Sequence, residues 1–545
     1  MNPQRFINIA AHLPEMARLQ PDTPSIIFPG GNRRLSFHEL NALSDRIAHG
    51  LVKNGIGRGV RTVLMVPPGP DLFALTFALF KAGAIPVLID PGLGIRNLKA
   101  CLAEAEPQVF IGIPKAHVAR ILFSWGKKTL RTHVTVGRRL FWRGITLADL
   151  LQHEEENISF SPAPTDRDDT AAILFTSGST GPPKGAVYSH GNFSAQVEEL
   201  REIYDIRPGE IDLPTFPLFA LFAPALGMTA VIPEMDFTRP GSVDPQKIIS
   251  AITTYGVTTM FGSPALINRV GRYGADNGIK LPTLKRVISA GAPVPAIVLE
   301  RFTKMLQPDA EIFTPYGATE ALPVCSIGSN EILTETRAIT DAGGGVCIGR
   351  PVPGIRLEVI EISDEAIPVW KDALRVPPGK IGEIVVQGEQ VTRGYYCRPE
   401  ANRLSKIADP AGGFLHRMGD LGGTDDKGRI WFCGRKSHRV ETPDGPLFTI
   451  PVEGVFNTHP MVFRTALVGI GKMGEQRPVL CVELEKGTTV NKEQIRKELF
   501  EIAKAHVHTL GISTFLFHPA FPVDIRHNAK IFREKLAVWA EGKMA

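Results

Sequence analysis

The first half of the chain alternates short apolar runs with segments of helical periodicity, and no other feature of the sequence constrains the fold as strongly. Apolar side chains recur at helical spacing over 36–54 and 72–82, and Ser36 stands three residues before Glu39 as a helix cap. The strand-like runs are 61–67, 85–89, 109–113, 171–175 and 287–290. Alternating β and α segments are typical of parallel sheets covered by helices, so the sequence predicts an α/β fold.

The pattern changes after about residue 350, where short strand-like runs are separated by Gly and Pro turns. From Arg435 onward a polar connector leads into a compact α/β tail. We therefore predict a large N-terminal domain, 1–433, of two mixed or parallel sheets with packed helices plus a β-rich subdomain. A hinge at 434–438 and a small mobile α/β C-terminal domain at 439–545 complete the predicted organisation.

The charge and cysteine content exclude several classes of protein. Lys plus Arg is 61 and Asp plus Glu is 56, and this small excess predicts no nucleic-acid partner. The six cysteines are scattered and form no CxxC pair, which indicates reduced thiols rather than a disulfide framework or zinc site. The first 22 residues lack a signal-peptide core. Together these features predict a cytoplasmic protein.

Two segments raise the question of membrane contact. Residues 213–233 carry no charged side chain and are long enough to span a bilayer, but they contain four prolines. We interpret them as buried core, or as the wall of an apolar ligand pocket. Residues 126–143 are basic and include Phe141 and Trp142. This segment is either solvated surface or a contact for a membrane or a partner protein.

The segment TSGSTGPPKG, 176–185, directly follows an apolar strand-like run. Gly178, Gly181 and Gly185 permit positive φ, so that backbone N–H groups can approach an anion, and Lys184 adds a positive charge. The segment is not a Walker A loop, because its lysine precedes a glycine instead of following one. A flexible linker is the alternative. We predict a polyphosphate-binding loop.

This loop resembles the signature of the adenylate-forming enzymes, the superfamily of acyl-CoA synthetases, luciferases and peptide-synthetase adenylation domains. Seven further segments resemble landmarks of that superfamily in the same order along nearly the whole chain. They are SAGAP (289–293), TPYGATE (314–320), GRP (349–351), GE (382–383), GD (419–420), GR (434–435) and the segment HNAKIFR around Lys530.

The resemblance implies ATP and Mg²⁺ as the reaction's nucleotide and metal. It places Tyr316 on adenine, Thr319 at the α-phosphate and Lys530 between a carboxylate and that phosphate. The implied catalytic residues are Lys530, Glu320, Thr176 and Lys184, of which Glu320 and Thr176 would hold the metal. The implied nucleotide-binding residues are Thr176, Ser177, Gly178, Ser179, Thr180, Gly181, Lys184, Gly291, Ala292, Pro293, Tyr316, Gly317, Thr319, Asp420 and Arg435.

The chain departs from the general superfamily pattern at positions that support transfer of the acyl group to a thiol. Ser437 stands at the hinge, Glu441 stands near a usual lysine, and Ala220 replaces a histidine or aromatic gate. With these departures, the segments FPLFALF (216–222) and DIRHNAK (524–530) resemble the bacterial β-lactone synthetases of long-chain olefin biosynthesis, the OleC family.

That resemblance implies a 2-alkyl-3-hydroxy fatty acid as substrate, whose own hydroxyl replaces CoA as acyl acceptor. Phe216, Phe219 and Phe222 would line the alkyl site, with plain core packing as the alternative. A condensing enzyme, a reductase and a hydrolase-like protein would be pathway partners. Two alternatives stay open: a medium- or long-chain acyl-CoA or acyl-AMP ligase, and a catalytically silent nucleotide-binding module. The presence of Lys184, Glu320, Asp420, Arg435 and Lys530 argues against silence.

Overall fold

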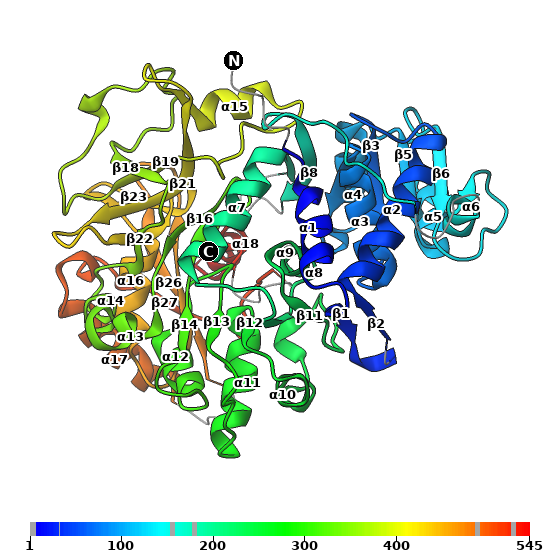
Figure 1. Cartoon of the computed structure of the whole chain (residues 1–545). Coiled ribbons are helices and arrows are strands. Elements are labelled where there is room, and N and C mark those ends of the chain that lie inside the picture. The colour runs from blue at the N-terminus through cyan, green and yellow to red at the C-terminus, as the bar shows by residue number, and fades with distance from the viewer. Residues whose placement is uncertain are drawn as a thin grey trace.

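The computed structural model describes residues 7–31, 33–152, 158–176, 182–485, 491–524 and 530–544. Within these ranges, three large sheets build the N-terminal part and a three-stranded sheet builds a C-terminal lobe (Figure 1). The helices are α1 (His12–Leu19), α2 (Phe37–Lys53), α3 (Pro70–Lys81), α4 (Ile95–Ala105), α5 (Pro114–Leu122), α6 (Leu147–Leu151), α7 (His190–Ile203), α8 (Pro217–Ala220), α9 (Phe222–Leu226), α10 (Pro245–Tyr255), α11 (Pro264–Asp276), α12 (Ala296–Thr303), α13 (Ser329–Glu331), α14 (Arg337–Asp341), α15 (Pro399–Ser405), α16 (Thr449–Phe456), α17 (Lys492–Lys504) and α18 (Arg533–Met544).

Two of the large sheets are mainly parallel, as the alternating pattern predicts. The first has the order β14-β13-β12-β10-β11-β1-β2 and the second β7-β6-β5-β3-β4-β8-β9; only β1–β2 and β8–β9 pair antiparallel. Their strands are β1 (Pro24–Phe28), β2 (Arg33–Ser36), β3 (Arg61–Met65), β4 (Ile85–Ile89), β5 (Val109–Gly112), β6 (Thr132–Thr135), β7 (Ile145–Thr146), β8 (Thr170–Thr176), β9 (Lys184–Ser189), β10 (Ile211–Pro214), β11 (Thr229–Val231), β12 (Thr259–Phe261), β13 (Arg286–Ile288) and β14 (Glu311–Phe313).

The third large sheet is antiparallel and forms the predicted β-rich subdomain. Its strands are β15 (Tyr316–Ala318), β16 (Ala321–Ser326), β17 (Val346–Pro351), β18 (Arg356–Ile360), β19 (Gly382–Gln387), β20 (Lys406–Ala408), β21 (Phe414–Thr424) and β22 (Ile430–Arg435).

Local sequence signals explain where several elements begin and end. The capping box at α2 is present, because the Ser36 side chain accepts from the Glu39 N–H and the Glu39 carboxylate accepts from the Ser36 N–H. The run predicted at 61–67 ends as a strand at Met65, because Pro67 and Pro68 have no N–H to donate. The predicted helices and strands of the first half are thus confirmed, with boundaries shifted by a few residues.

The uncharged stretch 213–233 forms two short helices, α8 and α9, between β10 and β11. Residues 223–233 are buried, which confirms the interpretation as core for that part, whereas 216–219 and 221–222 are half-buried. None of the described helices is both long enough and apolar enough to cross a bilayer.

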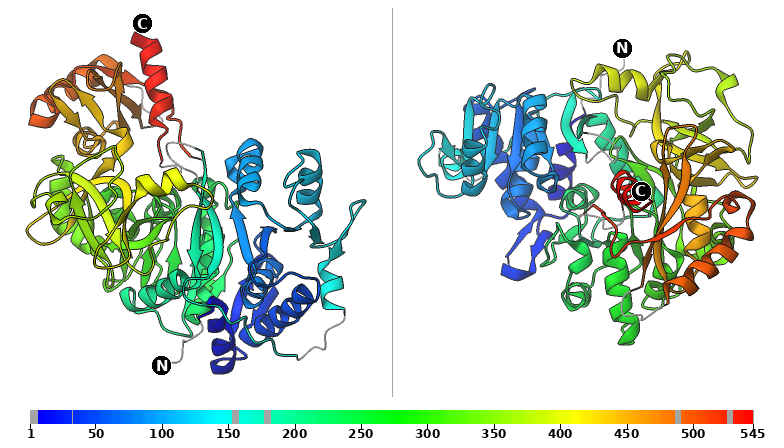
Figure 2. Two further views of the ribbon diagram at one scale, coloured as in Figure 1. Left: turned by 90° about the horizontal axis from the view of Figure 1, so that it is seen from above. Right: turned by 180° about the vertical axis from the view of Figure 1, so that it is seen from behind.

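The C-terminal lobe has its own apolar core. A hairpin of β23 (Val440–Thr442) and β24 (Gly445–Leu447) precedes the sheet of β25 (Val462–Ile470), β26 (Arg477–Leu484) and β27 (Phe515–Phe517). The first residue of the C-terminal lobe's apolar core is Val440, whereas β22 of the large sheet ends at Arg435. The chain therefore passes from one lobe to the other between these two residues. Figure 2 shows this lobe in orange to red, on the side of the molecule opposite the blue-to-cyan sheet.

One buried carboxyl makes stability depend on pH. Burial raises the pKa of Glu199 on α7 to about 8, and the neighbouring Glu198 and Glu202 add to the effect. The folded state therefore holds a proton that the unfolded state releases, so this contribution to stability falls as pH rises from about 4.5 to about 8. Glu199→Gln should raise the melting temperature by about 2 °C at pH 8 and change it little at pH 5. Glu475→Gln, at an exposed position in the C-terminal lobe, is the control, and an equal shift at both pH values in Glu199→Gln would contradict the assignment.

Candidate active site

The predicted phosphate loop joins two antiparallel strands. Thr176 at the end of β8 pairs with Lys184 at the start of β9. Ser177, Gly178, Ser179, Thr180 and Gly181, with the side chain of Thr176, lie outside the described residues. Gly185 does not adopt the positive φ that glycine permits. Glycine is needed there for space, because a Cβ would lie 2.8 Å from the Ile173 side chain.

A segment distant in sequence brings a tyrosine to Lys184. The Val187 N–H donates to the Gly394 carbonyl at 2.9 Å and the Tyr396 N–H donates to the Gly185 carbonyl at 2.8 Å. This pairing places the Lys184 Nζ 4.9 Å from the centroid of the Tyr395 ring, a cation–π contact. The β-rich subdomain is thus joined to the β8–β9 hairpin at the position of the predicted phosphate site.

The same tyrosine orients the predicted metal ligand. The Tyr395 hydroxyl donates to Glu320 Oε1 at 2.7 Å, and burial together with the Glu320 charge raises the pKa of Tyr395. The Glu320 carbonyl accepts from both the N–H (2.8 Å) and the hydroxyl (3.1 Å) of Thr392. Hydrogen bonds therefore hold both the side-chain carboxylate and the backbone carbonyl of Glu320 in place without a ligand.

Two basic side chains near Glu320 were not predicted from the sequence. Lys406 donates to the Thr392 carbonyl and lies over the Phe414 ring at 4.4 Å, and its burial lowers its pKa to about 7. His416 on β21 is buried, and burial and the Lys406 charge lower its pKa. Neither residue belongs to a recognisable motif, and only the pairing of β20 with β21 brings them together.

A second cluster forms around Asp420, the predicted ribose ligand. The Tyr316 hydroxyl donates to Asp420 Oδ2 at 2.6 Å, and Arg435 Nη1 donates to Oδ1 at 2.8 Å. Asp420 and Arg435 face each other on β21 and β22. The negative charge of Asp420 raises the pKa of Arg435. Three residues predicted from separate motifs are therefore in direct contact.

The predicted adenine-side segment has two features that suit a ligand. Gly291 has φ +101°, a conformation that residues with a side chain rarely adopt. Ser289 Oγ is buried and has no hydrogen-bond partner among the described residues. Nearby, a Cβ at Gly317 would lie 2.6 Å from the Ala321 carbonyl, and the Thr319 carbonyl accepts from the Tyr188 hydroxyl. An unpaired buried hydroxyl beside a glycine turn fits a polar nucleobase edge.

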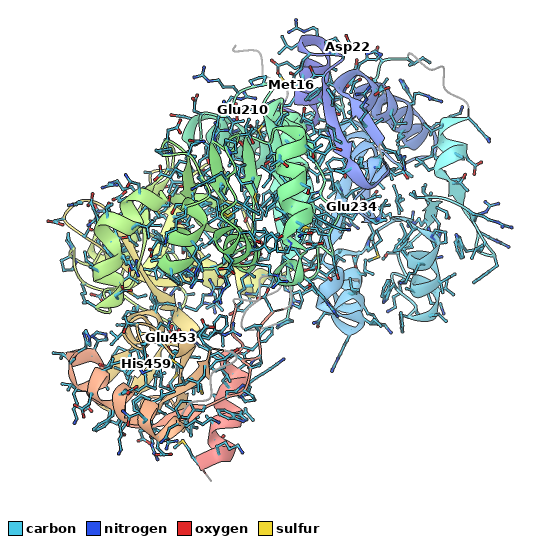
Figure 3. The ribbon with its side chains drawn as sticks, turned by 90° about the horizontal axis from the view of Figure 1, so that it is seen from below. Met16, Asp22, Glu210, Glu234, Glu453 and His459 are labelled. Atoms are coloured by element: carbon cyan, nitrogen blue, oxygen red, sulfur yellow. The ribbon has the colours of Figure 1, made fainter. Side chains whose placement is uncertain are left out.

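Lys530 lies in the C-terminal lobe with its side chain exposed. Its N–H donates to Asp524 Oδ1 at 3.1 Å, and its carbonyl accepts from the Asp524 N–H at 3.0 Å. Three residues later, Arg533 donates to both carboxylate oxygens of Glu453, at 2.7 and 2.6 Å. Figure 3 labels Glu453 in this lobe. The buried ion pair fixes the start of α18 and with it the chain that carries Lys530.

The three phenylalanines predicted to line the alkyl site differ in their packing. Phe216 and Phe219 are half-buried and form a chain of edge-to-face contacts with Phe261, at 5.0 and 4.6 Å between centroids. Phe222 instead packs on the main apolar core and contacts Phe193. All three rings are half-buried, so burial does not separate the pocket interpretation from the core alternative, although Phe222 is the one that packs against the main core.

A cavity of about 570 Å³ lies between the two lobes. Ile339 and Trp431 line it from the N-terminal side, and Phe448, Pro451, Val452 and His508 from the C-terminal lobe. Within the described chain, no residue predicted to bind the nucleotide lines this cavity. It is therefore separate from the two clusters above.

The fold and the two clusters define an adenylate-forming class, and comparison with known proteins gives the same class. The model of a family described as AMP-binding enzyme matches residues 13–396, so the chain belongs to that family. The chain is 52% identical over 547 residues to the olefin beta-lactone synthetase of Xanthomonas campestris pv. campestris, covering 98% of this chain and 97% of that protein. It is 51% identical to the olefin beta-lactone synthetase of Stenotrophomonas maltophilia, covering 99% of each chain.

Solved structures share the fold. The amide bond synthetase McbA from Marinactinospora thermotolerans has a TM-score of 0.81 at 20% identity, with 98% of this chain and 99% of that chain covered. ATP-bound MatB from Rhodopseudomonas palustris has a TM-score of 0.79 at 20% identity, with 99% and 100% covered. At this identity the likeness concerns the fold alone.

The contact between Tyr395 and Glu320 gives a testable prediction. Tyr395→Phe removes the hydroxyl that orients the proposed metal-binding carboxylate, and a hydrogen bond to a charged group contributes about 1.5–3 kcal/mol. We expect the Mg²⁺ concentration for half-maximal pyrophosphate exchange to rise about tenfold. Tyr396→Phe is the matched control, since the Tyr396 ring lies against Arg61. Unchanged Mg²⁺ dependence in Tyr395→Phe would exclude the orienting role.

Proposed function

We propose that this protein is an ATP-dependent, AMP-forming ligase that converts a 2-alkyl-3-hydroxy fatty acid to a β-lactone through an acyl-adenylate, in long-chain olefin biosynthesis. The observation that carries the proposal is the 51–52% identity, over nearly the full length, to proteins named olefin beta-lactone synthetase. Membership of the AMP-binding enzyme family supports the adenylating step.

In the first step the fatty acid's carboxylate oxygen bonds to the α-phosphorus of ATP, and the bond to pyrophosphate breaks. Two anions must approach each other, so preorganised cations are the main source of catalysis. Lys530 neutralises the carboxylate and the α-phosphate, while Lys184 and the 176–185 loop bind the departing phosphates. Tyr316, Asp420 and Arg435 hold the nucleoside, and the observed contacts among them support that role. Mg²⁺, held by Glu320 and Thr176, supplies further charge neutralisation when bound.

In the second step the 3-hydroxyl oxygen attacks the acyl carbon of the adenylate. The bond from that carbon to the AMP oxygen breaks, AMP leaves with the electron pair, and the hydroxyl proton is lost to solvent or buffer. Holding nucleophile and carbonyl in one molecule removes the entropy cost of a separate acceptor, which is worth up to about 7–11 kcal/mol in well-oriented cases. The accessible rings of Phe216 and Phe219 suit an apolar wall for the alkyl chains.

The residues that depart from the thiol-transferring pattern support this intramolecular route. Glu441, near a usual lysine position, is an acceptor for Arg439, which also pairs with Asp364. The carboxylate is therefore held in place, and its charge disfavours a pantetheine phosphate there. Ala220 is fully buried, so the position of the usual gate offers no polar group.

We also propose the division into a domain 1–433, a hinge 434–438 and a mobile lid 439–545 that carries Lys530. Separate apolar cores in the two lobes support it. A cytoplasmic location suits an ATP-dependent reaction, and all six cysteines are free. A condensing enzyme, a reductase and a hydrolase-like protein are the proposed pathway partners, and peripheral membrane contact the proposed route to a lipid substrate.

Product analysis with and without CoA tests the proposed function. The protein is incubated with Mg·ATP and a 2-alkyl-3-hydroxy acid, and lactone, thioester and AMP are quantified. We expect lactone and AMP in equal amounts without CoA, and no change when CoA is added. A thioester formed only with CoA would instead identify an acyl-CoA ligase, and absence of AMP formation would indicate a silent nucleotide-binding module.

A further inference from the structure

One stretch of the chain contains no acidic residue at all. Residues 107–148 include eight Lys or Arg side chains and no Asp or Glu. The whole chain has a formal net charge of +5, so the remaining residues sum to 5 − 8 = −3. The near-neutral total therefore hides a strong separation of charge between this stretch and the rest of the protein. The eight cations are Lys115, Arg120, Lys127, Lys128, Arg131, Arg138, Arg139 and Arg143.

The fold collects this stretch at one end of the molecule. It comprises β5, α5, β6 and β7, at the edge of the sheet that begins with β7. In Figure 1 these elements lie at the right, on the side away from the C-terminal lobe, and Figure 2 shows the same separation. All eight cations except Arg120 are exposed. In the part of the chain that the structure describes, none of the eight forms an ion pair with a carboxylate.

Large apolar side chains project from the same end. Phe141 is 76% exposed and Leu140 50% exposed in the connection between β6 and β7, and Leu122 at the end of α5 is 72% exposed. Exposed aromatic and aliphatic side chains among cations, with no acidic neighbour in the sequence, are typical of surfaces that enter the boundary between lipid headgroups and acyl chains.

The apolar tip stands on a rigid base. Trp142 is buried, stacks on His117 of α5 with 5.1 Å between centroids, and donates from Nε1 to Thr135 Oγ1 at 2.9 Å. The Phe141 ring lies edge-on to Trp142 at 5.3 Å. The tip is therefore fixed to β6 and α5, so that Leu140 and Phe141 are presented together with the flanking arginines.

We propose that this end of the molecule, defined by α5, residues 126–131 and residues 137–144, docks on an anionic lipid bilayer. The cations bind lipid phosphates, and Leu140 and Phe141 enter the headgroup boundary. A purely polyanionic partner would use the cations but gain little from these aliphatic and aromatic tips, which favours lipid over nucleic acid or an acidic protein. Docking would give the site direct access to a substrate with two alkyl chains, and this benefit rests on the proposed function. The proposal that this end binds lipid does not depend on that function.

Vesicle sedimentation without ATP or fatty acid tests the docking apart from the chemistry. The full chain is mixed with vesicles of phosphatidylglycerol and phosphatidylcholine, or of phosphatidylcholine alone. We expect binding to the anionic vesicles that weakens as salt is raised, and at least tenfold weaker binding to the neutral ones.

Two variants separate the contributions of charge and insertion. Lys128→Glu/Arg138→Glu/Arg143→Glu should weaken binding to anionic vesicles at least tenfold. Leu140→Ser/Phe141→Ser should weaken it severalfold with the charge unchanged. The control Lys53→Glu/Lys371→Glu/Lys472→Glu makes the same change of net charge at exposed sites elsewhere and should bind like the original chain. Unchanged melting temperatures exclude misfolding as the cause.

Three results would overturn the proposal. The first is that the original chain does not bind anionic vesicles at low salt. Binding of an acidic protein to this end would not rescue the proposal in that case. The second is an equal loss of binding in the control variant. The third is full binding by Leu140→Ser/Phe141→Ser together with competition by duplex DNA, which would make the surface a general polyanion site.

Discussion

Lys530→Ala should lower carboxylate-dependent pyrophosphate exchange by about 10³-fold, the largest effect of any single change in the proposed site. The loss follows from the chemistry: without the ammonium group, a carboxylate must approach the α-phosphate against uncompensated repulsion. The fold should be unaffected, because the Lys530 side chain is exposed and the surrounding chain is held by Asp524 and by the Arg533–Glu453 ion pair.

Lys535→Ala is the matched control for Lys530→Ala. Lys535 is an exposed lysine near the start of α18, and its Nζ lies 4.5 Å from the centroid of the Phe532 ring. It should exchange pyrophosphate at the original rate, and both variants should melt at the original temperature. Full exchange activity in Lys530→Ala would remove this lysine from the mechanism, and an equal loss in Lys535→Ala would indicate a general disturbance of the lobe.

Asp420→Asn should weaken binding of Mg·ATP by about 100-fold when titrated calorimetrically without fatty acid. The Asp420 carboxylate accepts from both Tyr316 and Arg435, so the substitution removes the charge that holds the half-buried Arg435 and removes the proposed acceptor for the ribose hydroxyls. Loss of the ion pair with Arg435 will also lower the melting temperature, by less than for a fully buried pair because the arginine side chain is partly exposed.

Asp425→Asn distinguishes lost nucleotide binding from lost stability. Asp425 stands just past the end of β21 and accepts from Arg429 at 2.7 Å and from the Trp431 indole at 2.9 Å. It is thus an aspartate–arginine pair of similar kind, away from the proposed ribose site. This variant should melt at a lower temperature and bind Mg·ATP as before. Equal loss of ATP affinity in both variants would contradict the assignment of Asp420.

The elements of the first half were predictable because their signals are local. Helical periodicity and the Ser36–Glu39 box identify α2, and apolar runs identify β3, β4 and β5. The order of strands in the sheets was not predictable, since it depends on contacts between distant segments. The place of β8 beside β4 is an example, because residues 90–169 separate the two strands and carry no signal for their pairing.

The proposed site shows the same limit. Tyr316, Glu320, Asp420 and Arg435 stand in recognisable motifs, and the structure brings Tyr316 and Arg435 into contact with Asp420. Tyr395, Thr392, Lys406 and His416 stand in none. They reach Glu320 or its neighbours through three pairings of distant segments: 391–392 with 320–321, 394–396 with β9, and β20 with β21. Residues that orient a ligand are set by tertiary contacts, for which a single sequence carries no pattern.

Atom tracing with ¹⁸O tests the central claim most directly. A 2-alkyl-3-hydroxy acid labelled with ¹⁸O at the 3-hydroxyl is turned over with Mg·ATP and no CoA, and the lactone and AMP are analysed by mass spectrometry. Attack of the hydroxyl on an acyl-adenylate predicts that all label stays in the lactone ring and that AMP carries none. Label in AMP would show that the hydroxyl, and not the carboxylate, is activated, and would contradict the account.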